Sequence, residues 1–497
     1  MRRRKVKQGF FPTTINQLKE TLEKQFENNS DLMFSSFTHQ GKKLAVFYIP
    51  YQIESNKLEK LLKTLLSEEK EWTSETLLNE IPLGSGKKTS DLQQILTKLI
   101  VGEIFIYIEN ENEAISYQEE SREKRNLEKA ETESLVLGPK IAFTESLETN
   151  LNIIRWEIRS PDLVLEELTI GKDLPCKVRM IYLKTVANDQ DIQTMRQRLQ
   201  DLDVDMVEDA AVLAQYIEDS ETNLFPQLET TELPDRFIFE INEGKVGVLV
   251  ENSPTGILAP ATIFSFLKST EDLYMRWQTG SFLRLLRMIA IFLSIIITPL
   301  YVAIVSFHYG IIPTQLLVSI GKSRAAVPFP PLVEALLLEF LIELLREAGA
   351  RLPTKVGQTM GIVGGIVIGQ AAVDAGLTSN ILIIVVAMSA LASFTAPSYL
   401  LGTTVRLVRF PLILLSGFLG FYGLMFGLCL LIIHMLRTKS LGHSYLIPVY
   451  PLNISDFLGV FIRLPIRYNY KRMESYHPKK LFRFPKKEAL GKKHMKK

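Results

Sequence analysis

Carboxylates recur inside one otherwise apolar stretch of the chain, and they are the residues best placed to do chemistry. At about 100° per residue, Glu339, Glu343 and Glu347 fall on one stripe of a helix. An unpaired carboxylate in hydrocarbon costs about 2.5 kcal/mol or more, so this stripe must face water or a protein partner. Several copies in a ring would favour cations. We therefore predict that four residues line a pore or an inter-subunit surface: Glu334, Glu339, Glu343 and Glu347. A soluble bundle with glutamates on its solvated side is the alternative.

A ladder of glycines follows the acidic helix. Four of them recur at a spacing of four residues, a pattern that allows helix backbones to approach closely in a membrane. We predict helix packing, and no ligand, for Gly357, Gly361, Gly365 and Gly369. Together with the acidic stripe, the ladder indicates a multi-helix membrane assembly.

Motifs for catalysis or metal binding are missing from the sequence. It contains neither a nucleophile elbow nor a zinc-binding pair of histidines, and its two cysteines, Cys176 and Cys429, lie in different regions. The loop GSGKKTS would need glycine at Ile81 and serine or threonine at Lys88 to bind a phosphate. We predict a protein that is not an enzyme, with no catalytic residue, no metal site and no cofactor.

Charge is distributed unevenly although the net charge is only +2. From Arg437 to Lys497 there are fifteen Lys and Arg residues against three Asp and Glu residues. Such a tail favours contact with anionic lipid headgroups on the cytoplasmic side. Nucleic acid is the competing partner, but no folded recognition motif accompanies the charge, so we predict none.

The part of the chain before the first apolar span alternates strand and helix patterns. This order predicts an α/β domain, divided into a basic arm and helix (1–32), a first subdomain (33–117), a charged linker (118–134) and a second subdomain (135–275). We expect a helix capped by Thr144 and a hairpin in which FIFEIN pairs with KVGVLVEN across Glu243 and Gly244. The N-terminus lacks the apolar core of a signal peptide, so this domain is expected in the cytoplasm.

Long apolar segments fill residues 276–437 and predict an α-helical multi-span membrane domain, followed by a basic cytoplasmic tail (438–497). Spans are expected near 288–307, 356–373, 381–401 and 410–436, with the short acidic membrane helix at 332–347. A cytoplasmic tail requires an even number of crossings, but five apolar segments are present. One segment must therefore enter without crossing, and either Leu332–Leu345 or Ile381–Phe394 is short enough.

Several long strings in the chain identify a resemblance. PFPPLVEALLLEFLIELLREAGARLP, FTESLETN, FPQLETTELPDR and LYVAIVSFH resemble the GerA family of bacterial spore germination proteins, over roughly residues 130 to 440. The chain departs from the family pattern at Leu137 and Leu233, where relatives usually have arginine.

The resemblance implies the A subunit of a nutrient germinant receptor in the spore inner membrane. Such subunits act with a permease-like B subunit and a lipoprotein C subunit. A homo-oligomer that conducts cations is the mechanism we expect. The SpoVAF-type branch of the family, a non-conducting membrane scaffold and a secondary transporter are the alternatives. A transporter would need internal repeats and about ten spans, which the sequence lacks.

Overall fold

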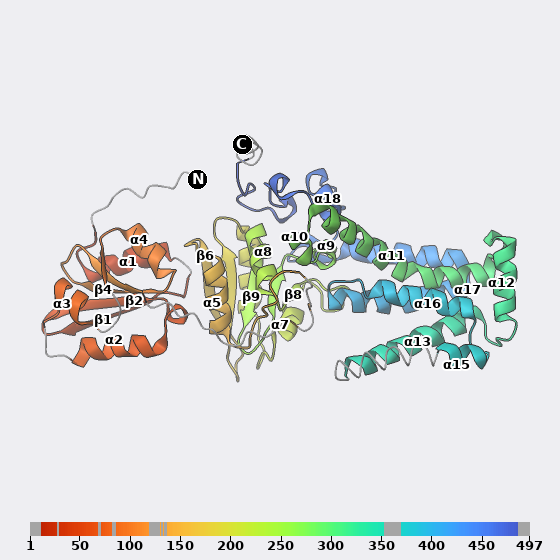
Figure 1. The fold of residues 1–497 in the computed structure, drawn as a ribbon, viewed down its shortest axis with the longest axis horizontal. Helices are drawn as coiled ribbons and strands as arrows, with labels where there is room; N and C mark the ends of the chain where they lie inside the picture. Colours follow the sequence, from red (N-terminus) through yellow and green to blue (C-terminus); the bar gives the residue numbers. More distant parts are fainter. Residues whose placement is uncertain are drawn as a thin grey trace.

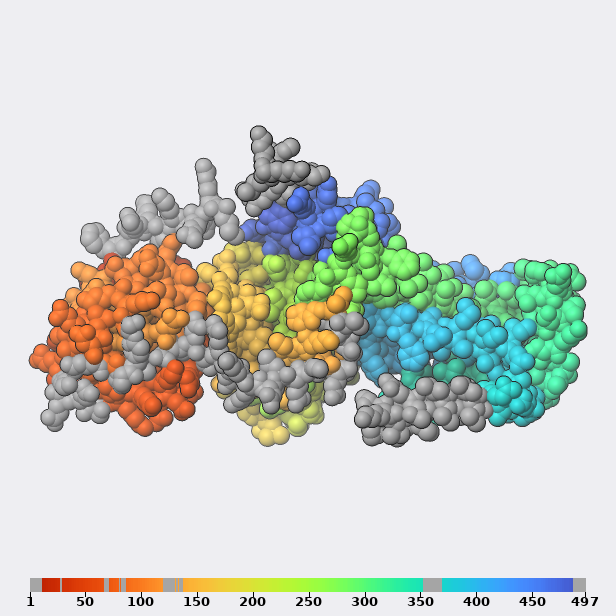
Figure 2. Space-filling model, in the orientation of Figure 1, coloured from red at the N-terminus to blue at the C-terminus, as the bar shows by residue number. Residues whose placement is uncertain are grey.

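A computed structural model describes residues 11–26, 29–67, 71–81, 86–118, 130, 133, 137–351 and 369–485. The molecule is elongated, with two α/β units at one end and a bundle of long helices at the other (Figure 1). The C-terminal segment returns from the bundle to the second α/β unit, as the space-filling view also shows (Figure 2).

The first α/β unit is a five-stranded antiparallel sheet covered by helices on both faces. Its strands lie in the order β1-β2-β4-β5-β3. Leu44 and Val46 of β2 pack against one layer of helices, while Ala45 and Phe47 pack against the other. Side chains alternate along a strand, so a strand buried on both faces must be apolar at every position, as LAVFYI is. The elements are α1 (Ile15–Gln25), β1 (Met33–His39), β2 (Lys42–Tyr48), η1 (Pro50–Gln52), α2 (Ser55–Ser67), α3 (Ser74–Glu80), β3 (Lys87–Thr89), α4 (Leu92–Leu99), β4 (Glu103–Ile108) and β5 (Ala114–Gln118).

The second α/β unit repeats this plan with strand order β6-β7-β9-β10-β8, again antiparallel. Helices α6 and α7 cover one face of the sheet, and α5 and α8 cover the other. The elements are α5 (Leu147–Glu157), β6 (Leu163–Ile170), β7 (Cys176–Leu183), α6 (Asp189–Gln200), α7 (Ala210–Ile217), β8 (Glu229–Thr231), α8 (Pro234–Glu243), β9 (Val246–Val250) and β10 (Gly256–Ala259).

Two local predictions in this unit are wrong. FIFEIN is not a strand but part of α8, because Pro234 starts a helix and Gly244, at φ +111°, ends it. Strand β9 pairs instead with β7 and β10. The cap of α5 is Ser146 and not Thr144, whose backbone N–H donates to the side chain of Asn150 at 2.8 Å.

The two α/β units are joined by a buried ion pair. Asp31, just before β1, accepts a hydrogen bond from Arg155 of α5, and both side chains are fully buried. Close by, the amide of Gln52 donates to Asn152 at 3.3 Å. Separating the units would expose or strand these charges, so the contact favours one fixed arrangement.

The helical domain begins after two short helices, α9 (Ile263–Leu267) and α10 (Glu271–Tyr274). Its long helices run side by side along the axis of the molecule (Figure 1). By length and composition, α11 and α17 are long and apolar enough to cross a membrane, and α16 is a shorter apolar helix. The elements are α11 (Trp277–Phe307), η2 (Tyr309–Ile311), α12 (Thr314–Arg324), α13 (Pro331–Ala350), α15 (Gly369–Asp374), α16 (Asn380–Ser393) and α17 (Tyr399–Arg437).

Helix α17 is interrupted at Gly420, whose φ of +59° and ψ of −136° are not helical. The chain reverses there, as the contact between residues on either side of the turn shows. A Cβ on Gly427 would lie 2.5 Å from the side chain of Leu412, whereas fifteen residues of straight helix would separate them by about 22 Å. At the other end, Thr404 and His434 both hydrogen-bond the 223–224 segment of the second α/β unit. The single span predicted near 410–436 is therefore wrong: α17 forms two antiparallel legs, 399–419 and 421–437.

The C-terminal segment packs against the second α/β unit and the start of α11. It contains β11 (Lys439–Ser440), β12 (His443–Ser444), α18 (Ile454–Phe461), η4 (Ile466–Tyr468) and η5 (Glu474–Tyr476). Leu441 belongs to the apolar core of the second unit. Arg472 donates to the backbone oxygen of Asn242 at 2.6 Å, and Lys479 pairs with Asp189 at 2.5 Å.

Candidate functional site: the ionic seam of the helical domain

The predicted acidic stripe lies on α13, and each of its glutamates forms an ion pair with an arginine of the same chain. We call these four pairs the ionic seam: Glu334–Arg324, Glu339–Arg409, Glu343–Arg406 and Glu347–Arg351. Glu339, Glu343 and Glu347 lie on one side of α13 because they are four positions apart, whereas Glu334, five positions before Glu339, is rotated by about 140° from it.

The central pair of the seam is fully enclosed. Glu339 accepts from Arg409 at 2.6 Å, from the hydroxyl of Thr298 at 2.9 Å and from that of Ser389 at 3.2 Å. Arg409 also donates to Ser294 at 2.5 Å. The two charged side chains are only 4% and 3% exposed. Four helices therefore meet at one desolvated pair, where each oxygen of the carboxylate has a donor.

In the pair at the start of α13, the glutamate is buried as well. Glu334 is 1% exposed and accepts from Arg324 at 3.2 Å. Its other oxygen accepts from the backbone N–H of Ser379, the residue that caps α16. A carboxylate at the N-terminus of a helix is stabilised by the unpaired N–H groups there, so Glu334 fixes α16 against α13.

The remaining two pairs become steadily more exposed toward the end of α13. Glu343 accepts from Arg406 at 3.1 Å and its side chain is 40% exposed. Glu347 pairs with Arg351 at 2.6 Å, and the two side chains are 62% and 79% exposed. Exposed pairs contribute about 1 kcal/mol or less. Glu343 and Glu347 are thus the carboxylates of the stripe that a single chain leaves accessible.

The premise that only neighbouring copies or water could satisfy these carboxylates is wrong, because the chain supplies its own cations. The sequence pattern did not predict the pairing, since Arg406 and Arg409 are more than sixty residues away from their partners. A signal was nevertheless present. Two arginines three residues apart in an apolar helix complement glutamates four apart in another.

The glycine ladder falls mostly outside the described residues, which do not include Gly357, Gly361 and Gly365. Gly369 opens α15, and a Cβ there would meet no atom within 4 Å. Close backbone approach occurs instead in α17. A Cβ on Gly417 would lie 2.5 Å from Leu332.

A second charged cluster sits where the second α/β unit meets the chain leading to α11. Glu229 accepts from Lys245 at 2.7 Å and from Arg236 at 2.8 Å, all of them buried. Burial opposes charge on Glu229, but these two cations overcome it and hold the pKa of the carboxyl below its ordinary value. Lys245 also lies 5.2 Å from the ring of Tyr476, so the cluster ties the C-terminal segment to the sheet.

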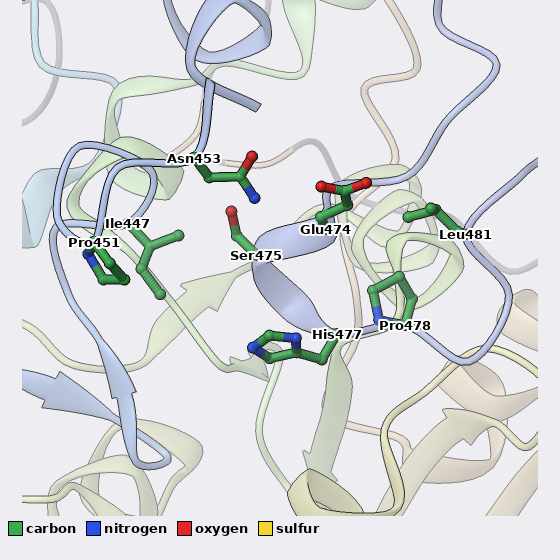
Figure 3. Close-up of a pocket in the computed structure, with 8 residues that line it drawn as sticks. All are labelled: Ile447, Pro451, Asn453, Glu474, Ser475, His477, Pro478 and Leu481. Carbon is green, nitrogen blue, oxygen red and sulfur yellow. The ribbon is translucent and has the colours of Figure 1, made fainter. Parts of the chain in front are cut away.

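A hollow of about 420 Å³ lies in the C-terminal segment beside this cluster (Figure 3). Ser475 and His477 leave the same turn in different directions (Figure 3). The hydroxyl of Ser475 donates to Asp456 at 2.5 Å. Because the hydroxyl of Ser475 donates to Asp456 and not to His477, the serine and the histidine are not arranged as a nucleophile and its base.

The fold thus has two parts. Two antiparallel α/β units are joined to a domain of apolar helices that is compatible with a membrane and contains the ionic seam. The model of the Bacillus/Clostridium GerA spore germination protein family matches residues 20–475. The chain therefore belongs to the GerA family.

Individual relatives match along almost the whole chain. "Spore germination protein GerQA" of Bacillus cereus is 39% identical over 482 residues, which cover 97% of each chain. "Spore germination protein B1" of Bacillus subtilis (strain 168) is 35% identical, over 91% of this chain and 95% of its own. Among solved structures, the N-terminal domain of the A subunit of the Bacillus megaterium spore germinant receptor GerK3 is 24% identical. It covers 51% of this chain and 98% of its own, with a TM-score of 0.40.

Proposed function

We propose that this chain is the A subunit of a spore germinant receptor, which turns detection of a nutrient into germination. One observation carries the proposal: a protein named for spore germination matches 97% of the chain from end to end. By this proposal the chain works in the spore inner membrane with a permease-like B subunit, a lipoprotein C subunit and further copies of itself.

The arrangement of apolar surface supports a multi-pass position in the membrane. Helix α11 leaves Ile289 56% and Phe292 61% exposed, three residues apart on one face. Such surface is stable in lipid and costly in water. Because α17 folds back at Gly420, one more crossing is available than the sequence pattern offered. Both ends of the chain can then lie in the cytoplasm without a re-entrant segment.

We further propose that several copies form a cation-conducting channel, with the acidic stripe turned toward the path of the ions. The accessible members of the seam, Glu343 and Glu347, are the residues that support this role. Partly exposed carboxylates can attract cations. Glu334 and Glu339 would then fix the helices behind them, since they are buried and paired.

A non-conducting scaffold is the second candidate, and the internal pairing of the seam favours it. If all four glutamates serve only to hold helices together, no ion path is needed. A SpoVAF-type accessory role in germination is compatible with the same geometry.

Germination of spores tests the general proposal. Spores that lack this chain are expected to stop responding to at least one nutrient, read as the fall in optical density of a spore suspension. Supplying the wild-type chain should restore the response. Unchanged responses to every nutrient that the parent spores recognise would contradict a receptor role.

Ion flux through the purified chain in vesicles tests the channel. We expect Glu343→Gln together with Glu347→Gln to lower the preference for cations over anions. Glu221→Gln, an exposed glutamate in the second α/β unit, is the matched control. Flux with unchanged selectivity would remove the glutamates from the path. The absence of flux from the wild-type chain and its partner subunits would favour the scaffold.

A further inference from the structure

A cavity of about 630 Å³ lies at the junction of the second α/β unit, the start of α11 and the C-terminal segment. Its walls come from α8, the 268–273 segment, Arg284 of α11, and residues 455–473 and Arg483 of the C-terminal segment. It is distinct from the ionic seam, which lies among the long helices. In Figure 1 this junction is the point at which α11 leaves the α/β unit and α18 packs beside it.

Cations outnumber carboxylates on the walls of the cavity. The lining includes seven cationic residues, Arg236, Lys268, Arg284, Arg463, Lys471, Arg472 and Arg483, against Glu240, Glu243 and Asp456. Each carboxylate already has a partner: Glu240 binds Lys245, Glu243 binds Arg483, and Asp456 accepts from Ser475. Four of the cations also pair with carboxylates, namely Arg236, Arg284, Lys471 and Arg483. Among the described residues, this leaves Lys268, Arg463 and Arg472 without a carboxylate within ion-pair distance.

Lys268 is the clearest case of a cation without a counterion. Its ammonium donates to the sulfur of Met473 at 3.4 Å, and no carboxylate lies within ion-pair distance in the described part of the chain. Burial, and then the neighbouring charge of Arg284, lower the pKa of Lys268 to about 8. An ammonium that is half-buried and faces a thioether loses part of its hydration without recovering it, so this position carries a cost in stability.

Further donors at the cavity are incompletely used. The hydroxyl of Thr270 is buried and has no hydrogen-bond partner among the described residues. Arg463 donates to the backbone oxygens of Leu273 and Met275, and so finds carbonyl dipoles in place of a carboxylate. Buried polar groups normally find partners, so the hydroxyl of Thr270 is available to donate to an acceptor in the cavity.

The rim of the cavity is apolar and exposed. Helix α18 contributes Ser455, Asp456 and Gly459 to the walls, and the chain that follows it contributes two exposed aliphatic side chains. In the following segment, Leu464 and Ile466 are 41% and 71% exposed, and both line the cavity. A cationic interior next to exposed aliphatic side chains matches an anionic headgroup attached to hydrocarbon. It matches a fully hydrated small anion less well, because such an anion has no apolar surface to place against the aliphatic side chains of the rim.

We propose that this cavity binds the phosphate group of an anionic phospholipid. Lys268 and Thr270 donate to the phosphoryl oxygens, Arg463 adds positive charge, and the acyl chains lie along Leu464 and Ile466. The bound lipid would join α11, the second α/β unit and the C-terminal segment at one point. This inference rests on the cavity alone and stands or falls independently of the role in germination.

The test measures binding of short-chain lipids to the full-length chain in detergent by native mass spectrometry. The probes are dihexanoyl phosphatidylglycerol, dihexanoyl phosphatidylcholine and inorganic phosphate. We expect phosphatidylglycerol to bind most tightly, and Lys268→Met to weaken its binding by about tenfold, the loss of one charge-assisted hydrogen bond. Lys439→Met removes the same charge from an exposed position and should leave binding unchanged.

Thr270→Val is a second variant, which keeps the shape of the side chain and removes only the hydroxyl. Thr270→Val should weaken the binding of phosphatidylglycerol severalfold. If Lys268→Met does not fold, this variant still tests the site. Inorganic phosphate that binds as tightly as phosphatidylglycerol would overturn the lipid and leave a site for a soluble phosphate compound. Equal binding of both lipids, unaffected by either variant, would overturn the anion site itself.

Discussion

At the scale of single residues, the buried and partly buried charges of this chain include two kinds. Glu339 and Arg409 satisfy one another in the ionic seam, whereas Lys268 faces a cavity without a counterion. The two kinds respond in opposite ways to removal of charge. Removing one member of a pair strands the other, while removing an isolated cation relieves a penalty.

Glu339→Gln should destabilise the helical domain by about 3 kcal/mol, because the charge of Arg409 is left buried. The double variant Glu339→Met with Arg409→Met should recover most of this loss. The measurement is the midpoint of thermal unfolding of the purified chain in detergent. Glu347→Gln, in the exposed pair, is the control and should change the stability by about 0.5 kcal/mol or less. A double variant as unstable as the single one would show that the pair is not the cause.

Lys268→Met should stabilise the protein at pH 7, by about 1–3 kcal/mol. The pKa of Lys268 falls from 10.5 to about 8 on folding. Between these values the unfolded chain binds more protons, so wild-type stability rises with pH through this window. The advantage of the variant should therefore shrink between pH 8 and pH 10.5. Unfolding midpoints across this range provide the measurement, and an advantage independent of pH would contradict the assignment.

At the scale of elements, strand β2 of the first unit could be predicted because a strand buried on both faces requires a continuous apolar run. The run LAVFYI is apolar at every position and becomes β2, buried on both faces. The segment FIFEIN carries the same β-forming residues and becomes a helix. Pro234 and Gly244 mark its ends, and these two residues outweigh β-propensity because they restrict the backbone directly.

Gly420 shows the same limit within an apolar helix. The segment 410–436 predicts one uninterrupted span by hydropathy, which is blind to the backbone angles of a single residue. Only glycine readily adopts φ near +60° with ψ near −136°, and a Cβ at this position would lie 2.8 Å from the ring of His308. The reversal follows from these contacts rather than from hydropathy.

Gly420→Ala should lower the stability of the helical domain by about 1–3 kcal/mol, because alanine is strained at this backbone conformation. Gly459→Ala is the control, since this residue lies within α18 and a Cβ there meets no atom within 4 Å. The control should be neutral or slightly stabilising. Thermal unfolding in detergent compares the two, and equal effects would argue against a turn at Gly420.

At the scale of the whole molecule, the glutamates of the ionic seam could be predicted from the sequence, but their arginine partners could not. The spacing of Glu339, Glu343 and Glu347 places them on one side of α13, and each of them forms an ion pair. Their partners could not be assigned, because pairing Glu339 with Arg409 requires knowing that α13 and α17 are neighbours. The matching spacing of arginines and glutamates indicates that two helices could pair, but it does not say which residues meet.

Labelling of single cysteines tests the reversal of α17 across the membrane. With Cys176 and Cys429 replaced, Tyr422→Cys reports on the turn and Leu452→Cys on the C-terminal segment. Both native side chains are exposed, at 82% and 64%. The two sites are expected to react with an impermeant maleimide from opposite sides of sealed vesicles, because one leg of about 26 Å separates them. Reaction of both from the same side would contradict the proposed crossing.

The position of Leu441 means that the hydrophobic core of the second α/β unit can be completed only after the helical domain has been synthesised. This leucine is 4% exposed within a core formed otherwise by residues 164–259, so the helical domain is inserted between two parts of one core. A ribosome must translate all the long helices before that core can close. Until then the core lacks this side chain, so the unit cannot complete its packing while the helical domain is being synthesised.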